Sequence, residues 1–81
     1  MADGSRRHLS DTIMALKEAM PPVHAAKMTS LHDKVLYTAP ELLGSLWKRL
    51  YDTVVEEAAV DEPWVEHARA IWNQACASRP T

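Results

Sequence analysis

The stretch that decides the fold is TAPELLGSLWKRLYDTVVEE, residues 38–57. Its apolar residues recur at intervals of three and four, which predicts an amphipathic helix. When successive residues are placed 100° apart, the apolar arc spans about 220°, whereas one core face needs only a little over ~100°. This helix therefore has more apolar surface than contact with one side of a core would cover.

The arc divides into two stripes. The first, which we expect to face the core, consists of Leu43, Leu46, Leu50 and Val54. The second, called the outer stripe below, consists of Trp47, Tyr51 and Val55 with Lys48 at its border. Trp and Tyr are common at binding hot spots because they offer a large apolar area at a small entropic cost. We therefore predict that the outer stripe binds a protein partner. The alternative is a central helix buried on both sides by its own bundle.

Three other segments show helical spacing. The first carries Leu9, Ile13, Leu16 and Met20 in a stripe only about 60° wide, which predicts a helix that touches one neighbour. Ser5 is its expected N-cap, and Pro21-Pro22 ends it because proline disfavours a continuing helix. The second segment, 23–37, has one apolar face and an expected irregularity near 27–30.

Two helix starts share a pattern of capping residue, any residue and proline. Thr38-Ala-Pro-Glu41 predicts a helix from about 39 to 59, and Asp61-Glu-Pro-Trp64 predicts a helix from about 62 to 77. The short turn between them predicts antiparallel neighbours. The last helix has an apolar face of ordinary width, so we expect Trp64 and Trp72 to lie in the core.

Strand signals are nearly absent, because no stretch alternates apolar and polar residues over a strand length. We predict an all-α fold, a small compact bundle of about four helices at 6–20, 23–37, 39–59 and 62–77. Residues 1–81 are expected to form a single helical domain, with frayed ends at 1–5 and 78–81.

The chain has one cysteine, Cys76, so the fold is not expected to depend on an internal disulfide. No apolar run approaches the ~20 residues of a membrane span, and the N-terminus lacks the apolar segment of a signal peptide. These features favour a soluble protein in the cytoplasm or another reducing intracellular compartment.

No motif for catalysis, metal binding or a cofactor appears. The four histidines are His8, His24, His32 and His67. His24 and His32 would lie about 12 Å apart along a helix, too far to share one metal ion. With only two glycines there is no phosphate-binding loop. We therefore expect no enzyme activity, no metal and no cofactor.

The sequence is most consistent with a non-enzymatic protein-interaction module or regulator. We expect it to form a homodimer or to bind a partner helix through the outer stripe. The alternative is a small helical nucleic-acid-binding protein that uses Arg6, Arg7, Lys48 and Arg49. A formal net charge of -2 weighs against that alternative, because phosphate binding favours a basic protein.

Overall fold

The computed structural model describes residues 2–79. These residues form the helices α1 (Ala2–Ala19), α2 (Pro22–Tyr37), α3 (Leu43–Glu57) and α4 (Trp64–Ala77). A 3-10 turn, η1 (Pro40–Leu42), precedes α3, and no strand occurs within residues 2–79. The predicted all-α bundle of four helices is confirmed.

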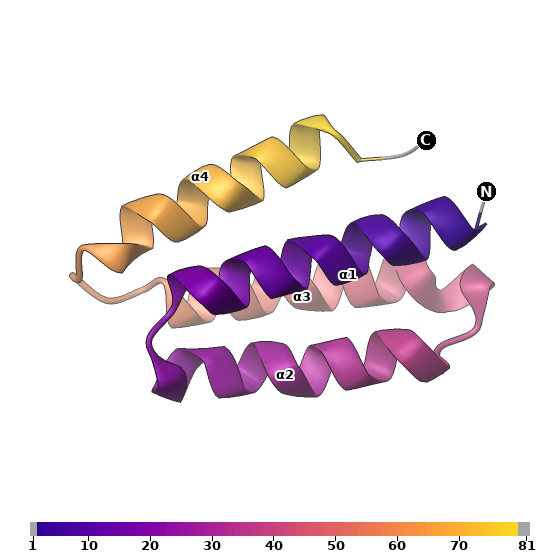
Figure 1. Ribbon diagram of the computed structural model, residues 1–81, viewed down its shortest axis with the longest axis horizontal. Coiled ribbons are helices and arrows are strands. Elements are labelled where there is room, and N and C mark those ends of the chain that lie inside the picture. The colour runs from indigo at the N-terminus through magenta and orange to yellow at the C-terminus, as the bar shows by residue number, and fades with distance from the viewer. Residues whose placement is uncertain (1, 80–81) are drawn as a thin grey trace.

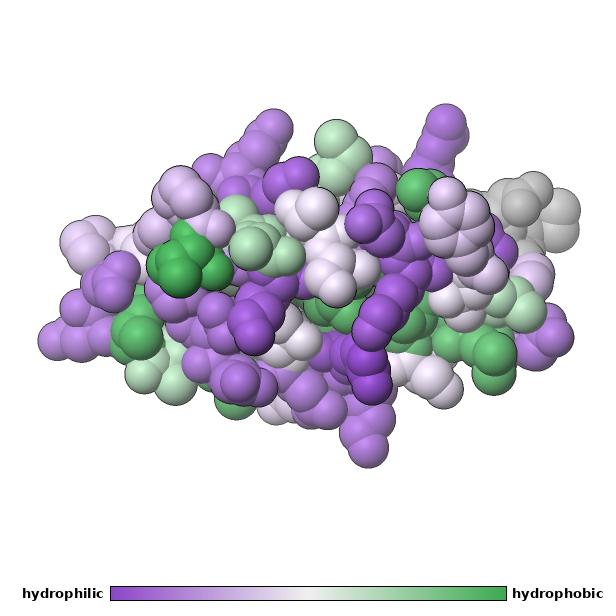
Figure 2. Space-filling model, turned by 90° about the horizontal axis from the view of Figure 1, so that it is seen from below, coloured by the Kyte–Doolittle hydropathy of each residue, from purple (hydrophilic) through white to green (hydrophobic). Residues whose placement is uncertain are grey.

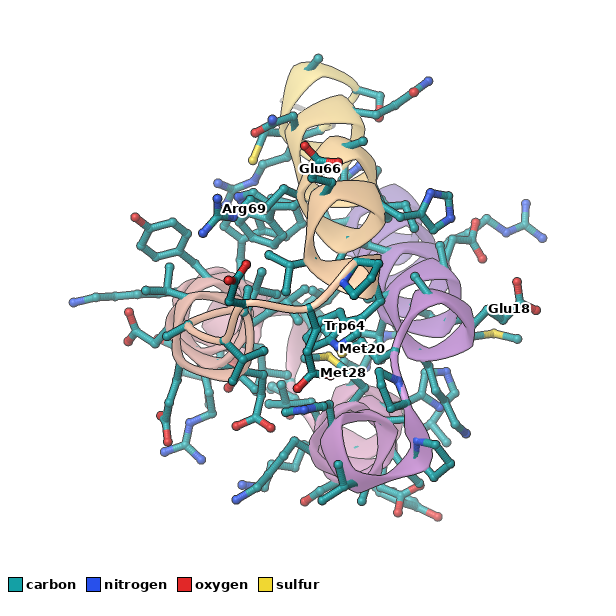
Figure 3. All side chains as sticks on the ribbon, turned by 90° about the vertical axis from the view of Figure 1, so that its left-hand side faces the viewer. Glu18, Met20, Met28, Trp64, Glu66 and Arg69 are labelled. Carbon is teal, nitrogen blue, oxygen red and sulfur yellow. The ribbon has the colours of Figure 1, made fainter. Side chains whose placement is uncertain are left out.

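Short connections reverse the chain after each helix, so the bundle runs up, down, up and down (Figure 1). The start of α1 and the end of α4 lie at the same end of the molecule, which measures 36 × 24 × 18 Å. In cross-section the four helices occupy four corners, with α1 opposite α3 and α2 opposite α4 (Figure 3).

One hydrophobic core receives side chains from every helix. Its buried members are Leu9, Ile13, Leu16, Met20, Met28, Leu31, Val35, Leu43, Leu50, Val54, Ala68 and Trp72. The stripes predicted for the first helix and the last helix are both part of it. At one end of the core, Met20, Met28 and Trp64 point inward, whereas Glu18 points to solvent (Figure 3).

The prediction that the first helix touches one neighbour is wrong. Helix α1 packs against α2 and α4 and also contacts α3. Its apolar stripe is narrow, but the residues on either side of the stripe have small side chains. Ala15 and Ala19 are partly buried and Thr12 is buried. The Thr12 hydroxyl donates to the carbonyl of His8 at 2.7 Å, so burial leaves it hydrogen-bonded. Because these side chains are small and the Thr12 hydroxyl is already hydrogen-bonded, other helices can pack beside the apolar stripe as well as on it.

Helix α2 is continuous, and the irregularity expected near 27–30 is absent. The hydroxyl of Thr29 donates back to the carbonyl of Ala25 at 3.3 Å, within the same helix. Pro22 occupies the first turn, where its missing N–H leaves no helical bond unmade.

The three predicted N-caps are wrong. Helix α1 already includes residues 2–5, so Ser5 lies inside it. The Thr38 hydroxyl donates to the carbonyl of Lys34, which ties it to the end of α2, and α3 begins only at Leu43 after η1. Helix α4 begins at Trp64 with Pro63 before it and no side-chain cap, so Asp61 stays in the turn. The expected fraying at residue 1 and residues 80–81 lies outside the described residues.

Candidate functional site

The site is built where α3 and α4 meet. Their backbones do not approach each other closely, and aromatic rings fill the space between them. Trp47 stacks on Trp72 with ring centroids 4.8 Å apart and planes 25° apart, and Tyr51 lies 5.7 Å from the same Trp72 ring. We call Trp47, Tyr51 and Trp72 the aromatic seam. Rings of this size hold the two helices apart and leave part of the contact open to solvent.

Trp47 is the enclosed member of the predicted outer stripe. Besides Trp72, its ring has His8 at 5.4 Å and the Arg79 guanidinium 4.6 Å from its centroid. Trp47 is therefore partly buried and packs against the core. Most of its apolar area is used within the molecule, as the central-helix alternative expected.

Tyr51 and Val55 remain open. Their exposed fractions are 49% and 53%, although both flank buried residues of the same helix. Between them and α4 lies a groove of about 170 Å³, lined by Tyr51, Val54, Val55, Ala58, Arg69, Trp72 and Asn73. The Arg69 side chain points toward the α3 side of α4, over this groove, whereas Glu66 lies on another side of α4 (Figure 3).

The inner stripe is confirmed as core. Leu43, Leu50 and Val54 are buried, and Leu46 is partly buried against the same core. The wide apolar arc of α3 is thus covered by α1 and α2 on one side and by the aromatic seam on the other. Within α3, Tyr51 and Val55 are the residues of the arc that stay strongly exposed, and Leu42, which precedes α3 in η1, is exposed as well.

Charged side chains lie on both helices near the groove, and Arg69 is the charged residue in its lining. Lys48, Asp52 and Glu56 are exposed along α3, and Arg69 lies on the α4 side. Among residues 4–79 the one ion pair within 4.0 Å is between His24 and Glu57, so the charges at the groove have no partner within this part of the chain. They are free to meet charges on another molecule.

The α4 side of the groove was missed by the sequence reasoning. Trp72 was expected in the core, and it is 9% exposed, but it also supplies one wall of the groove. Arg69 and Asn73 carried no sequence signal, because a polar residue beside a core face looks like any solvated helix residue. Only the position of α4 relative to α3 gives them a place at the site.

The face seen from the side of α2 also carries exposed apolar residues, and a hollow beside this helix is lined by Asp33, Lys34, Tyr37, Thr38 and Leu46. Val23, Leu36 and Tyr37 are strongly exposed on this helix. Figure 2 shows the apolar areas of that face as separate spots among predominantly polar atoms. Isolated apolar residues on a surface are ordinary and need no partner.

The four residues of the nucleic-acid alternative do not form one surface. Arg6 and Arg7 lie on α1 and Lys48 and Arg49 on α3, which occupy opposite corners of the bundle (Figure 3). The Arg6 guanidinium also donates to the carbonyl of Val35, which holds it against the end of α2. The structure therefore does not bring these side chains together.

His8, His24 and His32 are used for packing or hydrogen bonding, whereas His67 is exposed. His24 Nδ1 donates to Glu57 Oε1 at 2.9 Å and its ring lies 4.8 Å from the Trp64 ring. His32 Nε2 and Ser10 Oγ share a hydrogen bond of 2.7 Å. Across the residues that were described, no three His, Cys, Asp or Glu side chains are grouped so that they could hold a metal ion.

Within residues 2–79, no helix combines the length and the apolar character that a bilayer span needs.

Comparison of the chain with protein families, with curated proteins and with solved structures finds no match. The functional argument therefore rests on the groove and its borders.

Proposed function

We propose that this chain is a non-enzymatic protein-binding module that uses the groove between α3 and α4. The bound segment is a helix, either from another copy of the chain or from a different protein. The observation that carries the proposal is the half-exposure of Tyr51 and Val55 beside a groove walled by Trp72.

The size and lining of the groove favour a side chain as the occupant. At about 170 Å³ it is smaller than the ~300 Å³ at which sites for small molecules begin. It can take one or two side chains from a helix, whose neighbours at i and i+4 would lie over Tyr51 and Val55. Its buried floor, Val54 and Ala58, is apolar, so an apolar group bound on this floor would displace water from apolar surface.

The test is the double substitution Tyr51→Gln and Val55→Ser. Both side chains are about half exposed, so we expect helicity and cooperative melting to stay near those of the wild type. Association should be lost, because the apolar anchors are gone. Circular dichroism reports the fold, and sedimentation velocity together with affinity capture from extracts of the source cells reports association.

The matched control is Met14→Gln with Val23→Ser, which changes two exposed apolar residues on α1 and α2. It should associate as the wild type does. The proposal fails if the groove variant retains both self-association and partner capture. It also fails if that variant unfolds while the control stays folded, because Tyr51 and Val55 would then be structural.

A further inference from the structure

The charges along α3 indicate what occupies the groove. We infer that it is a second copy of this chain, paired so that the two α3 helices run antiparallel; this inference rests on the proposed function of the groove. The chain carries on one exposed edge both the positive and the negative groups that such a pairing requires.

The order of the charges along that edge favours an antiparallel pair. Lys48 comes before Tyr51, and Asp52 and Glu56 follow it, all on the exposed side of α3. None of the three makes an ion pair within residues 4–79. A parallel copy would set Lys48 beside Lys48, whereas an antiparallel copy sets each lysine beside carboxylates.

The register follows from helix geometry. In a pairing centred on Tyr51, Lys48 lies about 4.5 Å from the centre, because each residue rises ~1.5 Å. Asp52 and Glu56 of the other copy would lie about 1.5 and 7.5 Å from the centre in the same direction. The ammonium group of Lys48 is then level with a point midway between two carboxylates, and symmetry makes this contact twice.

The apolar groups fit the same register. Centring on Tyr51 places each tyrosine at the mouth of the other copy's groove, where the groove lining begins. Tyr51 brings a large apolar ring and a hydroxyl that can stay at the wet edge. Gly44, toward the start of α3, has open space where a side chain would be, so the second copy meets no obstruction there.

The charge of the whole bundle favours the same direction. The turn between α3 and α4 is acidic, with Glu56, Glu57, Asp61, Glu62 and Glu66 close together in sequence. The opposite end of the bundle, where α1 begins and α4 ends, carries Arg6, Arg7, Lys34 and Arg79 alongside Asp33 and Glu41. An antiparallel pair sets the acidic end of one copy near the more basic end of the other, which steers the encounter.

The experiment exchanges the charges between two variants. One variant is Lys48→Glu, and the other combines Asp52→Lys with Glu56→Lys. Each alone sets like charges against each other in the pair, so we expect each to weaken dimerisation about tenfold or more relative to wild type. An equimolar mixture restores opposite charges at both contacts, so it should dimerise about as tightly as the wild type.

Sedimentation equilibrium on the full chain measures these constants, at about 20 mM salt and again at about 300 mM salt, where screening should weaken the wild-type dimer several-fold. The new charges suit the ends of α3 on which they are placed, so the variants should keep the wild-type helicity. A mixture that stays as monomeric as its components overturns the antiparallel register. A wild-type chain that remains monomeric at about 200 μM, where a dimer of micromolar affinity would be nearly complete, overturns the inference itself.

The same material separates this inference from the proposed function. If the wild type is monomeric but captures a different protein in a manner that requires Tyr51 and Val55, the groove binds a partner other than itself, and only the dimer is excluded. If capture and self-association both survive the Tyr51→Gln and Val55→Ser change, the groove has no binding role and both statements fall.

Discussion

The helices pack differently around α1 and between α3 and α4. Around α1, aliphatic side chains such as Ile13, Leu16 and Met28 are fully buried and helix backbones approach closely. Between α3 and α4, the aromatic seam joins the helices while their backbones stay apart, and Tyr51 remains 49% exposed. The first arrangement buries its aliphatic side chains completely, whereas the second leaves Tyr51 and Val55 exposed beside a groove.

The difference shows why the width of an apolar stripe is an unreliable guide to the number of neighbours. Helix α1 has a narrow stripe and the most neighbours, because alanine and threonine on either side of the stripe allow close approach. Helix α3 has the widest arc, yet its outer stripe meets α4 only through ring faces. A binding surface here results from incomplete closure of a bundle.

The largest expected effect is on the α1 side. Leu16→Ala should reduce the free energy of unfolding by about 3–5 kcal/mol, because Leu16 is 0% exposed and the cavity it leaves is enclosed on several sides. Leu36→Ala is the matched control, since Leu36 is 55% exposed on α2 and its truncation should cost less than ~1 kcal/mol. Urea denaturation measures both, and equal costs would contradict the contrast between closed and open packing.

A smaller loss is expected in the aromatic seam. Trp72→Leu should cost about 1–3 kcal/mol, because α4 can move toward α3 and close part of the space that the ring leaves. A double-mutant cycle with Trp47→Leu should show a coupling of about 0.5–1.5 kcal/mol for the stacked pair. Additive costs would mean that the two rings are neighbours without a specific interaction.

The contact between His24 and Glu57 ties the start of α2 to the end of α3. Its side chains are 15% and 14% exposed. Glu57→Gln should cost about 1 kcal/mol, because a charged acceptor becomes neutral while an oxygen remains for the imidazole N–H. Glu18→Gln, exposed on α1 and away from α3, should leave thermal melting unchanged. If both substitutions lower the melting temperature equally, general charge accounts for the effect.

The smallest effect concerns the α4 border of the groove. Arg69 lies beside Val55 in the groove, and in the antiparallel dimer Val55 is level with Trp47 of the second copy. The Arg79 guanidinium of that second copy lies over its own Trp47 ring, so Arg69 and Arg79 come near each other. Arg69→Glu should therefore tighten dimerisation about two- to fivefold, because it replaces a repulsion between like charges with an attraction. Arg49→Glu, on α3 but outside the groove lining, should have no such effect. An unchanged dissociation constant for Arg69→Glu would place this border outside the interface.

Much of the fold could be predicted from spacing alone. The leucine stripe of the first helix and the inner stripe of α3 are buried as expected, since a 3.6-residue period leaves few other ways to hide them. Helix starts could not be predicted. Thr38 and Asp61 have the side chains of N-caps, but the hydroxyl of Thr38 is used by α2, and Pro63 precedes an α4 that begins after Asp61. A cap depends on the direction in which the chain enters the helix, which neighbouring elements set.

The candidate site was also predictable only in part, because the helical period shows which residues share a face but not what covers that face. The sequence drew attention to Tyr51 and Val55, which are exposed, and to Trp47, which is largely occupied by Trp72, His8 and Arg79. Residues 38–57 show the three as one stripe, because a helical projection contains no information about the distance to the next helix. The α4 wall of the groove lies in a separate segment, so its part in the site could not be read from this stretch.

The sequence by itself determined that the chain is helical, which residues make up the leucine core, and that α3 has more apolar surface than one core face needs. These are properties of single helices, and the period of the side chains is sufficient to establish them. Only the tertiary structure decided how that surplus is divided, because the division depends on how near α4 can come. The stacked tryptophans hold α4 at a distance that covers Trp47 and leaves Tyr51 and Val55 at the edge of a groove.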